Sequence, residues 1–275
     1  MQALFNLKMI ALQPTSLCNL NCSYCYLNEK DKNRRMSPDL TARIAQDLTD
    51  YATPAKPIEI LWHCGEPLAC GLVHFKRLIA PFKELELQGA VYHSIQTNAT
   101  LINEDWCGFF LEHNFSVGVS LDGPQWATRR RVNWTGREAF PKIMAGIETL
   151  KQAGINFGII AVVSREHLGR ASELYQFFPE LGCSILSINL EEEIGINRQV
   201  EVGQADEVRR FWTELFRVWQ TNPVRTRPTR RLPRAKLAGL ISGARSLSPT
   251  PTKCTSKALM AASAGFNILT KLAWN

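Results

Sequence analysis

The sequence lacks the features that mark membrane and exported proteins. No hydrophobic run reaches eighteen residues, so a membrane-spanning helix is not expected. The opening residues, MQALFNLKMIALQP, do not combine a basic head, a long apolar stretch and a small-residue cleavage site, which argues against an export signal. We therefore predict a cytoplasmic protein with no membrane partner. In that setting the eight cysteines are expected to be reduced thiols or metal ligands rather than disulfides.

Acidic residues are absent from the C-terminal part of the chain. From Thr221 to Asn275 there are ten Lys or Arg and no Asp or Glu, although the chain has 25 acidic residues. The net charge of the whole chain is +7, so removing the +10 of this segment leaves −3 for residues 1–220. A nucleic-acid partner is therefore not expected for the body of the protein. We expect residues 221–275 to form a short irregular basic tail.

Short apolar runs alternate six times with segments that have helical periodicity. Several runs are apolar nearly throughout, as expected for parallel strands that are covered on both faces. Ser37 and Pro38 provide a helix cap and a first-turn proline, and Gly89 and Gly154 provide helix ends. The predicted strands lie at 7–13, 58–62, 91–96, 116–121, 157–163 and 184–190.

Six strand–helix units predict an α/β fold over residues 1–220. They fit a partial (β/α)6 barrel, whereas the eight units of a full barrel do not fit in this length. An open doubly wound sheet is the alternative. In both folds the functional residues are expected at the C-terminal ends of the strands, so polar motifs at those ends test the assignment.

Three cysteines, Cys18, Cys22 and Cys25, follow the first predicted strand within eight residues. Their C-x3-C-x2-C spacing lets three thiolates on one loop bind an iron–sulfur centre. A four-iron, four-sulfur cluster normally takes four cysteines, so three leave one iron open to a small molecule. An open coordination position is typical of catalytic sites. A zinc site completed by Cys64 or Cys70, or three unligated thiols, is the alternative.

With Tyr24 before the last cysteine, this motif resembles that of the radical S-adenosylmethionine (SAM) superfamily. The resemblance implies a partial TIM-like barrel in which the amino and carboxylate groups of SAM bind the open iron. It also implies that an electron from the cluster cleaves SAM to a 5′-deoxyadenosyl radical, which abstracts a hydrogen atom. A reducing partner such as a flavodoxin or ferredoxin would supply the electron.

The segment after the second predicted strand, WHCGEPL, resembles the superfamily's Gly-Gly-Glu-Pro motif. Cys64 stands in place of the first glycine and is followed by Gly65, Glu66 and Pro67. The resemblance implies that backbone carbonyls here receive the methionyl ammonium of SAM, provided that the backbone path survives the loss of one glycine. A plain turn with a solvated carboxylate is the alternative. His63 beside this turn would reach the ribose, or it would bond a backbone carbonyl as a structural histidine.

Polar residues also follow the third and fourth predicted strands, in QTNATLIN and SLDGP. The resemblance implies SAM contacts for Asn98 and Asp122, and it assigns the SAM carboxylate to Ser120 and Arg131. Arg131 would bind it with a planar two-pronged fork. Tyr24 would pack beside the adenine, with a core role as the alternative. Helix capping and a β-turn would also explain these residues, but buried polar groups need partners in any case.

Four segments, WHCGEPL, HSIQTNATLIN, VGVSLDGP and INLEEEIGIN, resemble one subgroup more closely. These are the glycine-rich-repeat (GRRM-type) peptide maturases, cyclophane-forming enzymes in the SPASM-containing class that includes anaerobic sulfatase-maturating enzymes. The resemblance covers residues 5–220 and implies a ribosomally made precursor peptide as partner. It implies that a β-hydrogen is removed and the carbon radical is coupled to an aromatic ring. A formylglycine-forming maturase and an inactive relic are the alternatives.

Two departures separate this chain from that subgroup. The stretch QWATRRR, which ends at Arg131, lacks a His-Asp pair and one residue. A SPASM domain also needs several cysteines, whereas only Cys254 follows Cys183, so auxiliary clusters are not expected. We therefore interpret residues 221–275 as a truncated or out-of-frame remnant in place of a SPASM domain. A basic arm that docks an acidic leader peptide is the alternative.

Overall fold

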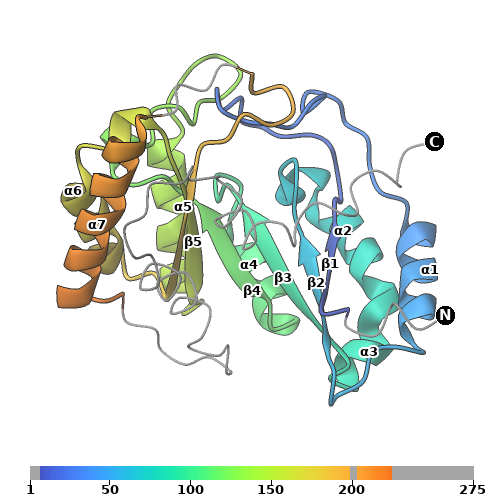
Figure 1. Ribbon diagram of the computed structural model, residues 1–275. Coiled ribbons are helices and arrows are strands. Elements are labelled where there is room, and N and C mark those ends of the chain that lie inside the picture. Colours follow the sequence, from blue (N-terminus) through green and yellow to red (C-terminus); the bar gives the residue numbers. More distant parts are fainter. Residues whose placement is uncertain (1–6, 199–202, 225–275) are drawn as a thin grey trace. The chain divides into compact units, whose positions relative to one another are not determined.

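The computed structural model describes residues 7–198 and 203–224 (Figure 1). The chain divides into one compact unit of residues 1–226 and a second unit of residues 227–275. The second unit lies outside the described residues, and so does the predicted basic tail beyond Val224. The fold below is therefore that of the first unit.

Six parallel strands form one sheet in which each strand pairs with its neighbours in sequence. The sheet curls into a half-barrel, which confirms the predicted partial barrel. Its strand order never reverses, so the doubly wound alternative is wrong. The strands are β1 (Met9–Leu12), β2 (Ile58–Trp62), β3 (Val91–Thr97), β4 (Ser116–Ser120), β5 (Phe157–Val163) and β6 (Ile185–Leu190).

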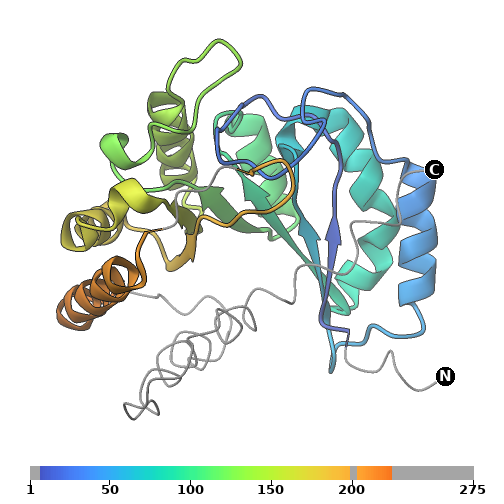
Figure 2. The same ribbon diagram turned by 45° about the horizontal axis from the view of Figure 1, so that its top comes forward.

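Helices cover the convex side of the curled sheet (Figure 2). Helix α1 begins as predicted, because Ser37 Oγ accepts the Asp39 N–H at 3.1 Å and Pro38 occupies the first turn. The helices are α1 (Pro38–Leu48), α2 (Leu72–Ile79), α3 (Lys83–Leu87), α4 (Glu104–Glu112), α5 (Phe140–Gln152), α6 (Ala171–Leu181) and α7 (Ala205–Thr221). Within the described ranges, none of them is long and apolar enough to cross a membrane.

One predicted helix is broken in the structure. The segment FKRLIAPFKELELQG, for which the sequence predicts a helix that ends at Gly89, is not one helix, because the short 3-10 turn η2 (Ala80–Phe82) separates α2 from α3. Pro81 lies in that turn, where it has no N–H to donate to the preceding helical turn. The break tilts the chain without exposing the core, since Phe75 and Phe82 are both fully buried.

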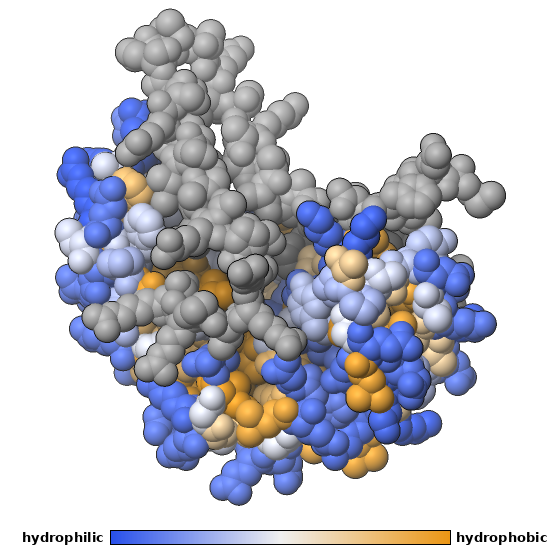
Figure 3. Space-filling view, turned by 90° about the horizontal axis from the view of Figure 1, so that it is seen from below, coloured by the Kyte–Doolittle hydropathy of each residue, from blue (hydrophilic) through white to orange (hydrophobic). Residues whose placement is uncertain are grey.

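The two faces of the sheet differ in exposure. In β5 the odd-numbered residues are buried, while the even-numbered ones are half-buried on the opposite face. In β6 exposed and half-buried residues alternate. The helices account for the buried face, so the concave face carries the accessible side chains. Seen from below, hydrophilic side chains cover most of the described rim, with hydrophobic patches nearer the middle (Figure 3).

Candidate functional site

The three cysteines lie on a loop just beyond β1 that is held by hydrogen bonds within its own backbone. The Cys18 N–H donates to the Lys30 carbonyl at 2.8 Å, and the Cys25 N–H donates to the Cys22 carbonyl at 3.2 Å. Each thiol is free and half-buried. Burial, the nearby Glu66 carboxylate and the other two thiols raise the pKa of Cys18 to about 12. A positively charged ligand would lower the pKa of Cys18 again, because it favours the thiolate over the thiol.

The surroundings of the thiols suit thiolates bound to a cluster. The Leu20 N–H and the Asn98 side-chain amide point at Cys18 Sγ, at 3.4 and 3.9 Å. Burial raises the pKa of Cys22, while Arg131 and Lys30 oppose that rise. Hydrogen bonds and positive charge near the sulfurs are the usual second shell of such clusters.

A single metal ion has no comparable site in the part of the chain that the structure describes. No group of three His, Cys, Asp or Glu side chains there could hold one ion. The zinc alternative with Cys64 or Cys70 is therefore not supported. A cluster differs in its demands, because each thiolate binds a separate iron and the sulfurs can lie further apart.

Glu66 ties the turn after β2 to the end of β3. Its carboxylate accepts the Thr97 hydroxyl at 2.6 Å, the Asn98 N–H at 2.7 Å and the Leu68 N–H at 3.1 Å. Only 1% of Glu66 is exposed, so the alternative of a solvated charge is wrong. Burial raises the pKa of Glu66 to about 7 against the effect of these three donors.

Gly65 brings this turn into contact with the cysteine loop. Its φ is +60°, and a Cβ at this position would lie 2.4 Å from the Thr15 carbonyl oxygen and 2.9 Å from that of Leu17. Only glycine fits both constraints. Cys64 has a φ of +71°, so it keeps the left-handed backbone that glycine would adopt there. Pro67 follows at the start of the short 3-10 turn η1 (Pro67–Cys70).

His63 and Asn98 flank the turn from two sides. His63 is hydrogen-bonded to the backbone of Gln96, and burial lowers the pKa of His63 to about 4, so its ring is neutral at pH 7. This contact matches the predicted alternative of a structural histidine. Asn98 donates to the Asn19 side chain at 2.9 Å, which joins the end of β3 to the cysteine loop. No motif in the sequence points to Asn19 as a partner of Asn98.

Asp122, predicted as a SAM contact, is the centre of a buried network. It accepts the Tyr24 hydroxyl at 2.6 Å, the Val162 N–H at 2.9 Å, and Arg131 through both Nε and Nη2 at 2.9 and 2.7 Å. Since two of the Arg131 nitrogens bind Asp122, the predicted two-pronged contact with the SAM carboxylate is not available in this arrangement. Ser120, on the concave face, accepts the Gln96 side-chain amide at 2.9 Å.

Two guanidinium groups lie close to the ring of Tyr24. The Arg130 and Arg131 carbons are 5.2 and 5.4 Å from the centre of its ring. With its hydroxyl bound to Asp122, this environment favours the alternative of a packing role over an adenine contact. Arg130 itself binds Glu191, and sequence reasoning assigned neither residue. Both residues lie in segments that the sequence analysis singled out for other reasons, Arg130 in QWATRRR and Glu191 in INLEEEIGIN.

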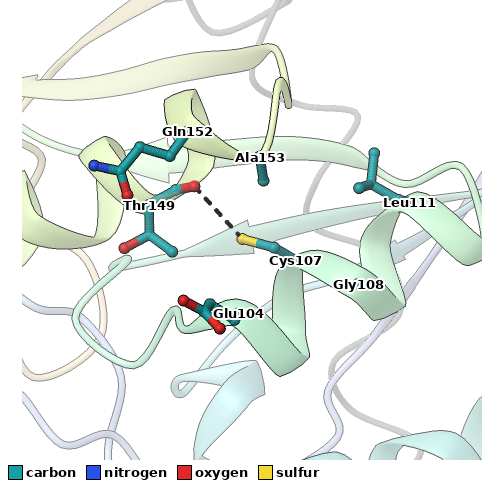
Figure 4. Close-up of a pocket in the computed structure, with 7 residues that line it drawn as sticks. All are labelled: Glu104, Cys107, Gly108, Leu111, Thr149, Gln152 and Ala153. Carbon is teal, nitrogen blue, oxygen red and sulfur yellow. Dashed lines mark hydrogen bonds between the residues drawn. The ribbon is translucent and has the colours of Figure 1, made fainter.

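A separate pocket of about 300 Å³ lies between α4 and α5 (Figure 4). Cys107 faces it and contacts the Thr149 carbonyl at 3.9 Å. Its lining comes from Glu104, Cys107, Gly108, Leu111, Thr149, Gln152 and Ala153. None of these belongs to the strand ends that carry the predicted motifs, so this pocket is not part of the candidate site.

Curated relatives are identical to this chain at about a third of the aligned positions. An uncharacterized protein of Synechocystis sp. is 34% identical over 221 residues, covering 77% of this chain and 55% of that protein. A serine-type anaerobic sulfatase-maturating enzyme of Klebsiella aerogenes is 32% identical over 223 residues, covering 78% of this chain and 54% of the enzyme. The chain spans about half the length of these curated relatives.

Solved structures share the half-barrel. The structure of anSMEcpe with bound AdoMet superposes with a TM-score of 0.68 and 26% identity, covering 80% of this chain and 62% of the other. Streptococcus suis SuiB bound to S-adenosylmethionine has a TM-score of 0.61, covering 80% of this chain and 49% of the other. At 18% identity, SuiB shows a likeness of fold only.

A family profile connects the chain to the chemistry that its motifs suggest. Residues 12–178 match the profile described as the radical SAM superfamily, which is more than half of the chain. The matched span contains the three cysteines and every predicted cofactor contact from Tyr24 to Arg131. The chain therefore belongs to the radical SAM superfamily, whose cofactors, a four-iron, four-sulfur cluster and SAM, are those that the sequence predicted.

Proposed function

We propose that this chain is the catalytic barrel of a peptide maturase that forms a cross-link in a ribosomally made precursor peptide. One observation carries the proposal: a three-cysteine loop is fastened at the mouth of a half-barrel to the turn that resembles the superfamily's SAM-binding motif. Gly65 makes that contact by its close approach to Thr15 and Leu17. The peptide substrate rests on the resemblance to the glycine-rich-repeat maturases. Because the chain spans about half the length of its curated relatives, the activity of the complete enzyme is also proposed rather than shown.

Each part of the site has a role in this reaction. Cys18, Cys22 and Cys25 would hold the cluster, and the backbone of the turn at 63–67 would receive the SAM ammonium. Ser120 and the third nitrogen of Arg131 would contact the SAM carboxylate. When bound, the cluster and SAM supply a 5′-deoxyadenosyl radical. Asn98 and Glu66 would hold the turn and the cysteine loop in register.

The reaction needs two partners besides SAM. A precursor peptide with glycine-rich, aromatic repeats would be the substrate, and a flavodoxin or ferredoxin would deliver the electron. The seven cysteines of the described part are free, which suits a reducing compartment. A cytoplasmic location stays a prediction on this basis.

A second candidate is the conversion of Cys or Ser to formylglycine in a sulfatase. It is favoured by the relatives named anaerobic sulfatase-maturating enzymes, including that of Bacteroides thetaiotaomicron at 34% identity over 175 residues. Both candidates share the barrel, the cluster and the cleavage of SAM. They differ in the peptide that is modified and in the mass change of the product.

The test is anaerobic reconstitution with iron and sulfide, followed by reduction and addition of SAM. We expect 5′-deoxyadenosine to form, and a glycine-rich aromatic peptide to lose two hydrogens on cross-linking. A sulfatase peptide converted to formylglycine, with the first peptide untouched, would select the second candidate. If no 5′-deoxyadenosine forms although a cluster is bound, the chain is an inactive relic.

A further inference from the structure

The sheet leaves β1 and β6 unpaired with each other, since they are the first and last strands of an open order. The loop that follows β6 nevertheless reaches the cysteine loop that follows β1. The Ile196 N–H donates to the Tyr26 carbonyl at 3.3 Å. Figures 1 and 2 both show this orange segment beside the blue one above the strands. The two loops meet one residue after Cys25.

This contact is tight. Gly195 has a φ of +62°, and a Cβ there would lie 2.1 Å from the Tyr26 carbonyl oxygen. A side chain at this position would push the two loops apart. The sequence of the loop after β6 is therefore adapted to meet the cysteine loop.

Arg130 connects the same two loops through its side chain. Its Nε donates to Ser23 Oγ at 2.8 Å, within the cysteine loop. Its Nη1 donates to Ser164 Oγ at 2.8 Å at the end of β5, and Nη1 and Nη2 bind the two oxygens of Glu191 after β6. One guanidinium on the segment after β4 thus joins the ends of three other strands. Its bidentate geometry is the strongest form of such a pair.

Glu191 is held in place for this role. Asn197, which is 7% exposed, donates from its side-chain amide to Glu191 at 3.2 Å and to the Glu192 carbonyl at 3.1 Å. The Glu191 side chain is 6% exposed and that of Arg130 is 27% exposed. An ion pair this sheltered is screened little by water, unlike an exposed one. Its geometry therefore fixes the distance between the loops.

We propose that Arg130, Glu191 and Asn197 form a clamp that positions the cysteine loop for cluster binding. They are positioning residues: Arg130 contacts the loop at Ser23 and Tyr24, Glu191 binds Arg130, and Asn197 binds Glu191. The clamp rests on the proposed cluster site, because its purpose is to keep three thiols at one spacing. It also makes the loop after β6 part of the cluster site, although this loop supplies no ligand in the described structure.

The first measurement uses the protein without cluster or SAM. Glu191→Gln keeps the size of the side chain and removes its charge, and Arg130→Lys keeps the charge and removes the fork. We expect amide hydrogen exchange in residues 18–26 to speed up by at least about tenfold in both, the effect of losing a charge-assisted hydrogen bond. Exchange in α1 should stay unchanged. Glu173→Gln is the matched control, because Arg170 and Glu173 form a two-pronged pair that is 45% and 51% exposed.

The second measurement follows cluster loss from reconstituted protein in the presence of an iron chelator. The clamp variants should lose iron at least about threefold faster, whereas Glu173→Gln should match the unmodified protein. If amide hydrogen exchange in residues 18–26 is as slow in Glu191→Gln as in the unmodified protein, the clamp proposal is wrong. Faster exchange with unchanged iron loss would overturn its role toward the cluster.

Two other results, a variant that does not fold and an unmodified protein that binds no cluster, can be distinguished from failure of the clamp. Should Glu191→Gln fail to fold, Asn197→Ala leaves the Arg130–Glu191 pair intact and removes the hydrogen bonds from Asn197 to Glu191 and to the Glu192 carbonyl. We expect it to show the same two effects, more weakly. If the unmodified protein binds no cluster, the proposed function fails on that result alone. The exchange measurement still decides on the clamp, because it needs no cluster.

Discussion

A single methyl group at Gly65 would test how the turn after β2 packs against the cysteine loop. Gly65→Ala forces an alanine to φ +60° and places its Cβ 2.4 Å from the Thr15 carbonyl oxygen. We expect a loss of about 1–3 kcal/mol of unfolding free energy from the backbone alone, and weaker cluster binding. Gly108→Ala is the control, because nothing lies within 4 Å of its added Cβ in α4. Equal stability of the two variants in urea titrations would contradict the close contact.

The cysteines themselves give the firmest prediction at this scale. If each of these thiolates binds its own iron, as we propose, replacing Cys18, Cys22 or Cys25 by Ala should remove the visible iron–sulfur absorption and all cleavage of SAM. Cys107→Ala should change neither, because Cys107 faces the pocket between α4 and α5. A variant of the first group with a full cluster and full activity would show that its cysteine is not a ligand.

Arg131 binds Asp122, and we propose that it also binds the SAM carboxylate, so two measurements on one variant test both roles. Arg131→Ala should weaken SAM binding by about 1.5–3 kcal/mol if its third nitrogen holds the carboxylate. It should also lower the unfolding free energy by about 3–5 kcal/mol, because Asp122 would remain buried without its cation. SAM affinity measured on folded protein, beside urea unfolding, tests both. Unchanged affinity with reduced stability would make Arg131 purely structural.

At the scale of elements, Glu66 links β2 to β3 and makes stability depend on pH. The pKa of its carboxyl is raised from 4.5 to about 7 in the folded protein, so the folded state binds a proton that the unfolded state has lost in this range. The stability from this group is full below about pH 4.5 and declines as pH rises through about 7, by about 3 kcal/mol in total.

Urea unfolding of the cluster-free protein at several pH values checks this. Glu66→Gln cannot ionise, so its stability should lack this decline, although its amide would face the Asn98 N–H and lower stability at all pH values. The difference between the two proteins isolates the contribution of Glu66. If both show the same slope between pH 5 and 7.5, then the carboxylate is ionised throughout and its three donors outweigh its burial.

The elements were largely predictable because their signals are local. Ser37 and Pro38 specify the start of α1 within two residues, and the apolar runs of β2 and β5 have the predicted bounds. The cysteine spacing is local too. The partners of the site residues were not predictable: Arg130 and Glu191 are 61 residues apart, and only the folded sheet brings them together. Likewise, Arg131 was assigned from a motif, which does not reveal that Asp122 occupies its fork.

At the scale of the whole molecule, residues just beyond the predicted boundary at 220 contact helix α6. Helix α7 runs to Thr221, and beyond it the Asn222 carbonyl accepts the Tyr175 hydroxyl at 2.9 Å. The same hydroxyl accepts the Val224 N–H at 2.9 Å. These contacts fasten the chain after α7 to α6. The first compact unit extends to Thr226, so we place the boundary for an experiment there.

Two shortened proteins test how much of the chain the barrel needs. A protein ending after Thr226 keeps all six strands, the cysteine loop, the clamp and the contacts of Tyr175. We expect it to fold, bind one cluster and cleave SAM without peptide at the rate of the full chain.

A protein ending after Gln220 loses both hydrogen bonds of Tyr175, and we expect its unfolding free energy to fall by about 1–3 kcal/mol. Urea unfolding and the rate of 5′-deoxyadenosine formation compare the three proteins. If the form ending after Thr226 fails to fold or to bind a cluster, residues 227–275 belong to the functional barrel, and our interpretation of them as a remnant is wrong.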